Sequence, residues 1–332
     1  MEYIIVTAVF FVLLMVYFRI ATKYNIIDHP NHRTSHSDIT VRGGGIIFPI
    51  AYLLFIGTEM FFNSDGLYGA EDQPNFFVFG AGFLLITILS FVDDLVDLPT
   101  KTRLIFHFIA VTLLLHFVNG FTILPIWELP FVYILAIGIL NAYNFMDGIN
   151  GISGVYSLVI LGSLWYVNQE IAPFILKDFI VYPTLACIVF LFFNFRKRAK
   201  CFLGDVGSMG IAFWIIALIA MLIIKTGDFK WLLFLSLYGI DTVITIVERI
   251  KRRENILEAH RRHLYQLFVN EQKQSHLTVS LLYGLFQLLI NIFVILSGLN
   301  TWFIFAMILI PTAILYIFLK LNILKKSLIK QS

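Results

Sequence analysis

The sequence predicts an all-α, polytopic integral membrane protein, and three observations support this fold class. The 332 residues are 59% hydrophobic and only 14% charged, whereas soluble domains carry roughly 25% charged residues. The mean hydropathy is +0.86, and phenylalanine alone contributes 34 residues. Long apolar runs recur along the whole chain. A soluble core could not hide so much apolar surface, so the bilayer is the expected solvent.

Eleven apolar runs are long enough to cross a bilayer, which takes about 20 mostly apolar residues in a helix. They are residues 3–20, 45–62, 76–92, 104–121, 129–145, 152–168, 179–195, 209–224, 231–248, 277–297 and 302–319. The first run has no basic segment before it and no small-residue cleavage site, so we expect it to remain as a span. We therefore predict about eleven transmembrane helices in a single transmembrane domain, residues 1–332.

The distribution of Lys and Arg predicts the orientation, because these residues favour cytoplasmic loops. With the N-terminus outside, 21 of the 24 Lys and Arg residues fall on the inner side, and only Lys177, Lys225 and Lys230 fall outside. The inner loops are also the ones rich in Asp, Asn, His and Gly. We expect an outside N-terminus, a cytoplasmic C-terminus and functional loops at the cytoplasmic face.

Two adjacent carboxylates, Asp93 and Asp94, end the third run. Carboxylates at a membrane boundary are costly to bury and usually functional, and a pair can hold a divalent cation or activate a nucleophile. An ordinary hydrated helix end is the structural alternative. Lys101 and Arg103 follow in the same loop, and we expect both to bind an anionic substrate.

The end of the fifth run and the loop after it carry Asn144 and Asp147, which share one helical face if the helix continues. The glycines that follow permit a tight turn. Hard oxygen ligands beside exposed N–H groups suit a Mg²⁺-diphosphate, although a helix cap with turn residues would look the same. At the start of the eighth run, Asp205 is either an N-cap or a metal ligand beside a helix N-terminus that attracts phosphate. We expect Asp205 to be functional.

The last long inner loop places His260 and His263 around two arginines. Arginine grips phosphates bidentately, and histidine exchanges protons near neutral pH. Attraction to anionic lipid would explain the arginines but not the histidines. Asp241 lies inside the ninth run, where a carboxylate is a functional candidate by default; pairing with an arginine is the alternative. In the first inner loop, three glycines after Arg42 predict either a phosphate cradle or close helix packing.

Taken in order, these motifs resemble the polyprenyl-phosphate N-acetylhexosamine-1-phosphate transferases, a family of bacterial membrane enzymes. The matching pieces are Arg33-Thr-Ser-His36 with Arg42-Gly-Gly-Gly45, Asp93-Asp94, Asn144-Phe-Met-Asp147-Gly148, Gly204-Asp205-Val-Gly-Ser208 and His260-Arg-Arg-His263. Each motif alone is weak, but five on successive inner loops are specific.

The resemblance implies a Mg²⁺-dependent phosphoglycosyltransferase, with Mn²⁺ as the other candidate metal. It would transfer a HexNAc-1-phosphate from a UDP-N-acetylhexosamine to undecaprenyl phosphate and release UMP. It implies the first membrane step of O-antigen, capsule or other cell-envelope glycan synthesis in the bacterial inner membrane, membrane lipid and a second copy of the chain as partners, and no nucleic acid.

The resemblance also implies roles for individual residues, by their position in the motifs. The metal ligands would be Asn144 and Asp205, and the catalytic residues Asp93, Asp94, His260 and His263. The substrate-binding residues would be Arg33, His36, Arg42, Lys101, Arg103, Asp147, Asn150, Gly151, Asp241, Arg261 and Arg262. The family often has Asp-Gly-x-Asp-Gly where this chain has Asn150 as the fourth residue, which removes one charge near the nucleotide.

A polytopic secondary transporter with cytoplasm-facing carboxylates is the alternative function. Transporters usually carry charges near the midplane and show duplicated halves with broken helices. In this chain only Asp241 is a candidate inside a run, and no duplicated half is visible. A non-catalytic lipid-binding protein would leave the five motifs unexplained.

Overall fold

The structure is a computed structural model that describes residues 1–28, 40–62, 74–255 and 260–331. Its long helices are α1 (Glu2–Lys23), α2 (Ile47–Phe62), α3 (Phe76–Val96), α4 (Thr100–Phe117), α6 (Leu129–Met146), α7 (Ile152–Glu170), α8 (Asp178–Asn194), α9 (Gly204–Thr226), α10 (Ser236–Lys251), α12 (His276–Leu296) and α13 (Thr301–Gln331). The short elements are β1 (Ile27–Asp28), β2 (Thr40–Val41), η1 (Gly44–Ile46), α5 (Gly120–Ile123), η3 (Phe229–Leu235) and α11 (Leu264–Asn270). The predicted all-α class is confirmed.

Among the described residues, nine helical segments are long and apolar enough to cross a membrane. Each of the eleven predicted runs contains a helix, and α7 and α8 are the two outside the nine. Helix α8 has only 17 residues, and α7 ends in the polar residues Asn168, Gln169 and Glu170. The polytopic membrane architecture is therefore confirmed, with nine spans by length and composition.

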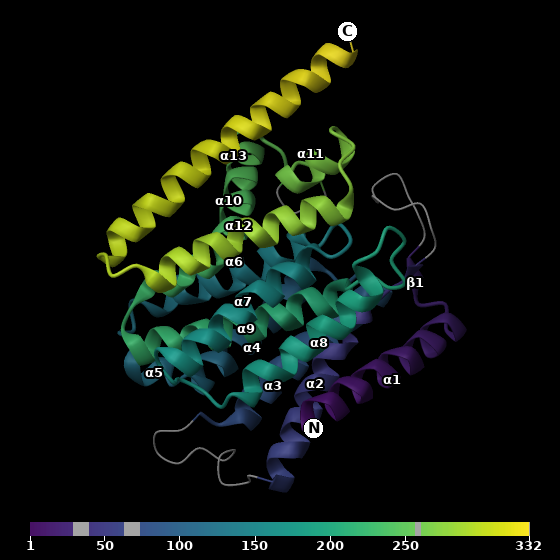
Figure 1. The fold of residues 1–332 in the computed structure, drawn as a ribbon, viewed down its shortest axis with the longest axis vertical. Helices are drawn as coiled ribbons and strands as arrows, with labels where there is room; N and C mark the ends of the chain where they lie inside the picture. The colour runs from purple at the N-terminus through teal and green to yellow at the C-terminus, as the bar shows by residue number, and fades with distance from the viewer. Residues whose placement is uncertain (29–39, 63–73, 256–259, 332) are drawn as a thin grey trace.

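Helix α9 is the centre of the bundle. Of its most apolar window, 78% is buried inside the protein, against 22% for α13. It packs against α2, α3, α6 and α7, because its apolar residues face every direction. Helices α1 and α13 lie at the periphery, and the C-terminal end of α13 extends beyond the other helices (Figure 1).

One end of the bundle, called the site end here, collects most of the predicted functional residues. The N–H of Gly44 donates to the carbonyl of Phe202 at 2.7 Å, and the Oγ of Ser280 donates to the carbonyl of Asn150 at 2.8 Å. These bonds join the loop before α2 to the loop before α9, and the start of α12 to the start of α7. The β1–β2 ladder, which pairs Ile27 with Val41, lies at the same end.

Two predicted substrate ligands in the first inner loop, Arg33 and His36, lie outside the described residues. Their roles stay predictions.

The ninth predicted run is one helix in the sequence pattern but two in the structure. The 3₁₀ helix η3 ends at Leu235, and α10 begins at Ser236. Gln287 from α12 bridges the break: its Oε1 accepts from the N–H of Leu237 (3.1 Å), and its Nε2 donates to the carbonyl of Leu233 (2.9 Å). In an apolar environment unpaired backbone groups are costly, so this side chain makes the break tolerable.

Candidate active site

The glycine turn at residues 43–45 packs directly against the start of α9. Its first residue has a φ of 76°, which favours glycine. The N–H groups of Gly44 and Gly45 already donate to carbonyls of the loop before α9. A Cβ added to Gly45 would lie 2.1 Å from the Cα of Gly207. Of the two alternatives for this turn, the structure supports close packing rather than a phosphate cradle.

Asp94, near the end of α3, is held by three groups. Its Oδ1 lies 2.8 Å from the Nη2 of Arg42, and its carboxylate accepts from the backbone N–H groups of Asp205 (3.2 Å) and Val206 (3.3 Å). Gly204 permits this approach, because a Cβ there would lie 2.7 Å from the Oδ2 of Asp94. Free N–H groups and the helix dipole favour an anion at this position, so Asp94 caps α9 from another helix.

Asp205 lies in the first turn of α9 and makes no capping bond. Its carboxylate neighbours the side chain of Asn144, at the end of α6, and the Nδ2 of Asn144 donates to the Oγ of Ser208 at 3.3 Å. Within the described part of the chain no basic side chain forms an ion pair with Asp205. The nearby Arg42 pairs with Asp94 instead. A carboxylate and an amide from two helices are therefore available to a cation.

The residues present fit a Mg²⁺ ion shared with a substrate. Among the described residues, no three His, Cys, Asp or Glu side chains gather into a metal-holding group. Protein-bound Mg²⁺ usually takes one or two carboxylates together with water and substrate phosphates, rather than an all-protein cage. The hard oxygens of Asp205 and Asn144 match that requirement.

Asp93 and Asp94 are adjacent in the sequence but contact different elements. The Oδ2 of Asp93 lies 2.9 Å from the Nη1 of Arg103, and its Oδ1 accepts from the N–H of Leu98 at 2.7 Å. Asp93 thus closes the turn between α3 and α4, whereas Asp94 faces α9. The side chain of Arg103 is 34% exposed, and Lys101 is exposed one residue into α4.

Asp147 follows the end of α6, is partly buried and interacts electrostatically with two other carboxylates. Burial raises the pKa of Asp147 to about 7, and the negative charges of Asp205 and Asp94 add to this effect. Because α6 ends at Met146, Asp147 lies beyond the helix and does not continue the helical face of Asn144. We call Asp94, Asp147 and Asp205 the acidic cluster.

Asn150 and Gly151 are tied into the protein by their own polar groups. The Nδ2 of Asn150 donates to the carbonyl of Arg196 at 2.8 Å. The N–H of Gly151, at a φ of 87°, donates to the Oδ1 of Asn194 at 2.6 Å. A carboxylate at position 150 could not donate such a bond, so the departure from Asp-Gly-x-Asp-Gly has a structural use. Membership of both residues in a nucleotide pocket stays a prediction.

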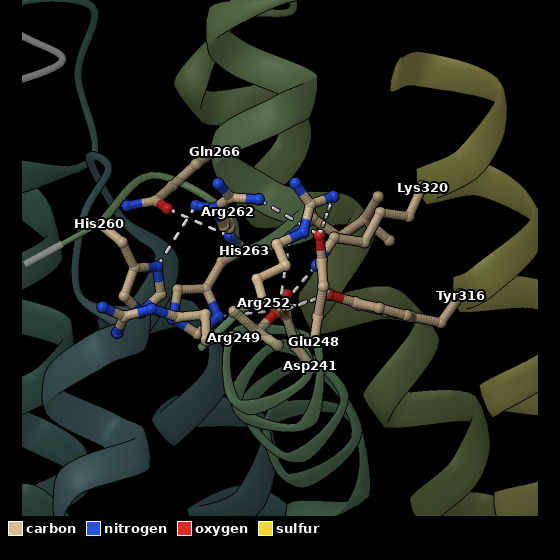
Figure 2. Close-up of polar contacts among 12 residues, drawn as sticks. Asp241, Glu248, Arg249, Arg252, His260, Arg262, His263, Gln266, Tyr316 and Lys320 are labelled. Carbon is tan, nitrogen blue, oxygen red and sulfur yellow. Dashed lines mark hydrogen bonds and ion pairs between the residues drawn. The ribbon is translucent and has the colours of Figure 1, made fainter. Parts of the chain in front are cut away.

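Asp241 is fully buried in α10 and accepts hydrogen bonds from several elements (Figure 2). Its Oδ1 lies 2.9 Å from the Nδ1 of His263 and 2.9 Å from the hydroxyl of Tyr316, and its Oδ2 accepts from Tyr283 at 2.8 Å. The N–H of Leu264 and the hydroxyl of Thr245 also reach Oδ1. We call these residues the Asp241 network. No arginine pairs with Asp241 among the described residues, so the predicted ionic alternative does not hold.

Glu248 is the centre of a second group of ion pairs (Figure 2). Its carboxylate lies 2.9 Å from Arg252, 3.4 Å from Arg262 and 2.8 Å from Lys320. Arg262 also lies 2.7 Å from Glu254. The guanidinium of Arg262 is therefore shared by two carboxylates of its own region, which disfavours its predicted use as a substrate ligand. The neighbouring Arg261 is partly buried.

The end of α6 joins the acidic cluster to the Asp241 network. Phe145 follows Asn144 directly, and its carbonyl accepts from the hydroxyl of Tyr265 at 2.9 Å. The ring of His263 lies 6.4 Å from that of Phe145 and 4.8 Å from that of His260. Burial, followed by the positive charges nearby, lowers the pKa of His260 to about 4. His260 is therefore neutral at pH 7.

Several supporting residues were absent from the sequence prediction. Tyr265, Tyr283 and Tyr316 bond to the site, and Ser208 and Lys320 extend it. The available signal was a polar group within or beside an apolar run, since buried tyrosine hydroxyls need partners. Nothing in their spacing pointed to Asp241.

Comparison with known proteins gives one family match. Residues 76–224 match the family described as Glycosyl transferase family 4. This region contains the acidic cluster, Asp93 and Asn144.

Similar proteins extend the match to most of the chain. A Bacillus subtilis (strain 168) protein named as a probable undecaprenyl-phosphate N-acetylglucosaminyl 1-phosphate transferase is 24% identical over 280 residues, which cover 80% of this chain and 75% of that protein. The decaprenyl-phosphate N-acetylglucosaminephosphotransferase of Mycobacterium leprae is 23% identical, with the same two shares of 80% and 75%. The phospho-N-acetylmuramoyl-pentapeptide-transferase of Petrotoga mobilis is 28% identical, but over 51% of this chain and 56% of that protein.

Proposed function

We propose that this chain, whose residues 76–224 match glycosyl transferase family 4, is a phosphoglycosyltransferase that moves an N-acetylhexosamine-1-phosphate from a UDP-sugar to undecaprenyl phosphate and releases UMP. The relatives that match 80% of the chain are named for N-acetylglucosamine transfer, whereas the relative named for N-acetylmuramoyl-pentapeptide transfer matches about half. This difference supports a UDP-N-acetylhexosamine as the donor.

The observation that carries the proposal is the acidic cluster at the end of the membrane helices. Its three carboxylates come from α3, α9 and the loop after α6, and Arg42 is the basic side chain paired with it. Like charges held this close are costly without a counter-charge. A divalent cation bound with a diphosphate would supply that charge, and a lipid phosphate can reach the same boundary without leaving the membrane.

For the metal we propose Mg²⁺ held by Asp205 and Asn144, with Mn²⁺ as an alternative of similar ligand preference. When bound, the ion would neutralise charge on the diphosphate and stabilise the transition state. The capping role of Asp94 supports this arrangement, because it fixes the first turn of α9 and hence the position of Asp205.

For the acceptor we propose the turn between α3 and α4. Arg103 is one-third exposed and lies 2.9 Å from Asp93, so it can bind an anionic phosphate while it orients that carboxylate. Asp93 can then accept the proton of a monoprotonated lipid phosphate as the phosphate oxygen attacks the β-phosphorus. The bond from that phosphorus to the UMP oxygen breaks, and UMP leaves. Exposed Lys101 adds positive charge to the same turn.

The remaining predicted roles belong to the same proposal. His260 and His263 would contact the donor from the last inner loop, and Asp147 would border the nucleotide. The site end would face the cytoplasm, where UDP-sugars are made, and the protein would lie in the bacterial inner membrane. The excess of Lys and Arg at this end supports that orientation.

A donor panel tests the proposal. Purified protein in detergent with Mg²⁺ and undecaprenyl phosphate should release UMP from at least one UDP-N-acetylhexosamine. Omission of either the lipid or the metal should abolish the release. The absence of release with every UDP-N-acetylhexosamine offered, in protein that remains folded, would refute the assignment.

A further inference from the structure

Asp241 has no free oxygen for a substrate. It is 0% exposed and receives bonds from its own helix and from α11, α12 and α13, as well as from His263 just before α11. Four of the five donors converge on Oδ1, and Oδ2 accepts from the hydroxyl of Tyr283, so each oxygen already has a protein partner. The predicted role of Asp241 as a substrate ligand is therefore incompatible with its surroundings.

The contact with His263 determines which ring nitrogen carries a proton. A carboxylate can only accept, and the ring nitrogen that faces Asp241 is Nδ1, at 2.9 Å. Nδ1 must therefore carry the hydrogen. Since Asp241 holds Nδ1, the ring can offer only Nε2 to anything else.

The Nε2 of His263 has no hydrogen-bond partner among the described residues, although the side chain is only 2% exposed. A buried polar atom without a partner is rare in folded proteins and destabilises them. An orphaned N–H costs more than an orphaned lone pair, above all on a charged group. An unprotonated Nε2, whose lone pair can accept a hydrogen bond from a ligand, agrees best with these surroundings.

The ring of His263 lies where a substrate could donate a hydrogen bond to Nε2. It packs against the rings of Phe145, His260 and Tyr265, and Phe145 adjoins Asn144 of the proposed metal site. The network around Asp241 (Figure 2) thus ends in one polar atom, the Nε2 of His263, whose ring packs against the residue next to Asn144.

We propose that Asp241 is a positioning residue that holds His263 as the Nδ1–H tautomer, so that Nε2 accepts a hydrogen bond from a hydroxyl or amide N–H of the sugar donor. The sugar contact rests on the proposed function, but the tautomer does not. In a Ser-His-Asp triad, replacement of the orienting aspartate by asparagine leaves the geometry intact and lowers kcat about 10⁴-fold through the wrong tautomer.

Histidine ¹⁵N NMR on the full-length protein in detergent tests the tautomer without substrate. His263 is assigned by the signal lost in His263→Asn. The wild type should carry the proton on Nδ1, and Asp241→Asn, whose amide N–H can face Nδ1, should move it to Nε2. A wild-type proton on Nε2 would overturn the proposal. If Asp241→Asn does not fold, the wild-type spectrum still decides the tautomer.

The kinetic arm uses Tyr283→Phe as the matched control, because it removes one bond to Asp241 and leaves the Nδ1 contact in place. We expect Asp241→Asn to lower kcat/KM for the UDP-sugar roughly 10²- to 10⁴-fold, and Tyr283→Phe to lower it less than about 10-fold. Equal losses in both variants would reduce Asp241 to a structural residue and refute its positioning role. If no UDP-sugar reacts while the wild-type proton is on Nδ1, the proposed function fails and the tautomer assignment stands.

Discussion

The acidic cluster and the Asp241 network lie at the same end of the bundle but differ in how many partners each carboxylate has. The acidic cluster brings Asp94, Asp147 and Asp205 together with one ion-paired arginine. The network surrounds one carboxylate with five donors. Carboxylates with too few positive partners can be retained where a ligand supplies the missing charge. A carboxylate that already accepts several hydrogen bonds serves instead to hold other groups in place. The contrast predicts which residues meet substrate and which support them.

Within the acidic cluster, Asp205→Asn should have the largest effect on turnover. The change removes the proposed metal carboxylate, so UMP release should fall roughly 10²- to 10³-fold. The thermal midpoint of the metal-free protein should stay equal or rise, because a like charge is removed beside two others.

Asp94→Asn is the matched comparison for that variant. It should also lose activity, but its thermal midpoint should fall, because the ion pair with Arg42 is lost and the cap of α9 is weakened. Near-normal turnover in Asp205→Asn, or a destabilisation equal to that of Asp94→Asn, would contradict the different roles assigned to the two carboxylates.

Gly45→Ala should displace groups around the acidic cluster without changing any of its carboxylates. The new Cβ would lie 2.1 Å from the Cα of Gly207, and such overpacking costs about 1–3 kcal/mol or more. The backbone before α2 must move, which separates Arg42 from Asp94. We expect a lower thermal midpoint and lower UMP release.

Gly57→Ala in the adjoining helix α2 is its control, because nothing lies within 4 Å of the added Cβ. It should be neutral or slightly stabilising, since alanine favours a helix over glycine by about 1 kcal/mol. A Gly45→Ala protein as stable as Gly57→Ala would show that the close contact is not needed.

His260→Gln should produce the smallest effect on stability, visible as a change in its pH dependence. The folded-state pKa of about 4 lies below the ordinary value of 6.5, so the unfolded chain takes up a proton first as the pH falls. The contribution of neutral His260 is complete above about pH 6.5 and is lost as the pH falls towards 4. The midpoint of the wild type should drop across this window more than that of His260→Gln, measured by thermal unfolding at pH 7.5 and 5. Parallel pH profiles would contradict the burial of His260.

Much of the architecture was predictable, because hydropathy and helix formation depend on neighbouring residues. All eleven predicted runs contain helices, and the described parts of the five motifs fall at the ends of helices or in the loops between them. The break between η3 and α10 was not predictable, because Gln287, which satisfies it, is about 50 residues away in the chain. The same holds for the pairing of Asp94 with the start of α9.

By itself, the sequence determined that this is a polytopic α-helical membrane protein with acidic and basic groups in its loops, because apolar length and charge are local properties. Only the tertiary structure decided what each polar group does. It separated Asp93 from its neighbour Asp94, turned the three glycines into a packing contact and made Asn150 a hydrogen-bond donor to Arg196. These roles depend on partners brought together by packing, and the distances between those partners are not encoded in any single segment.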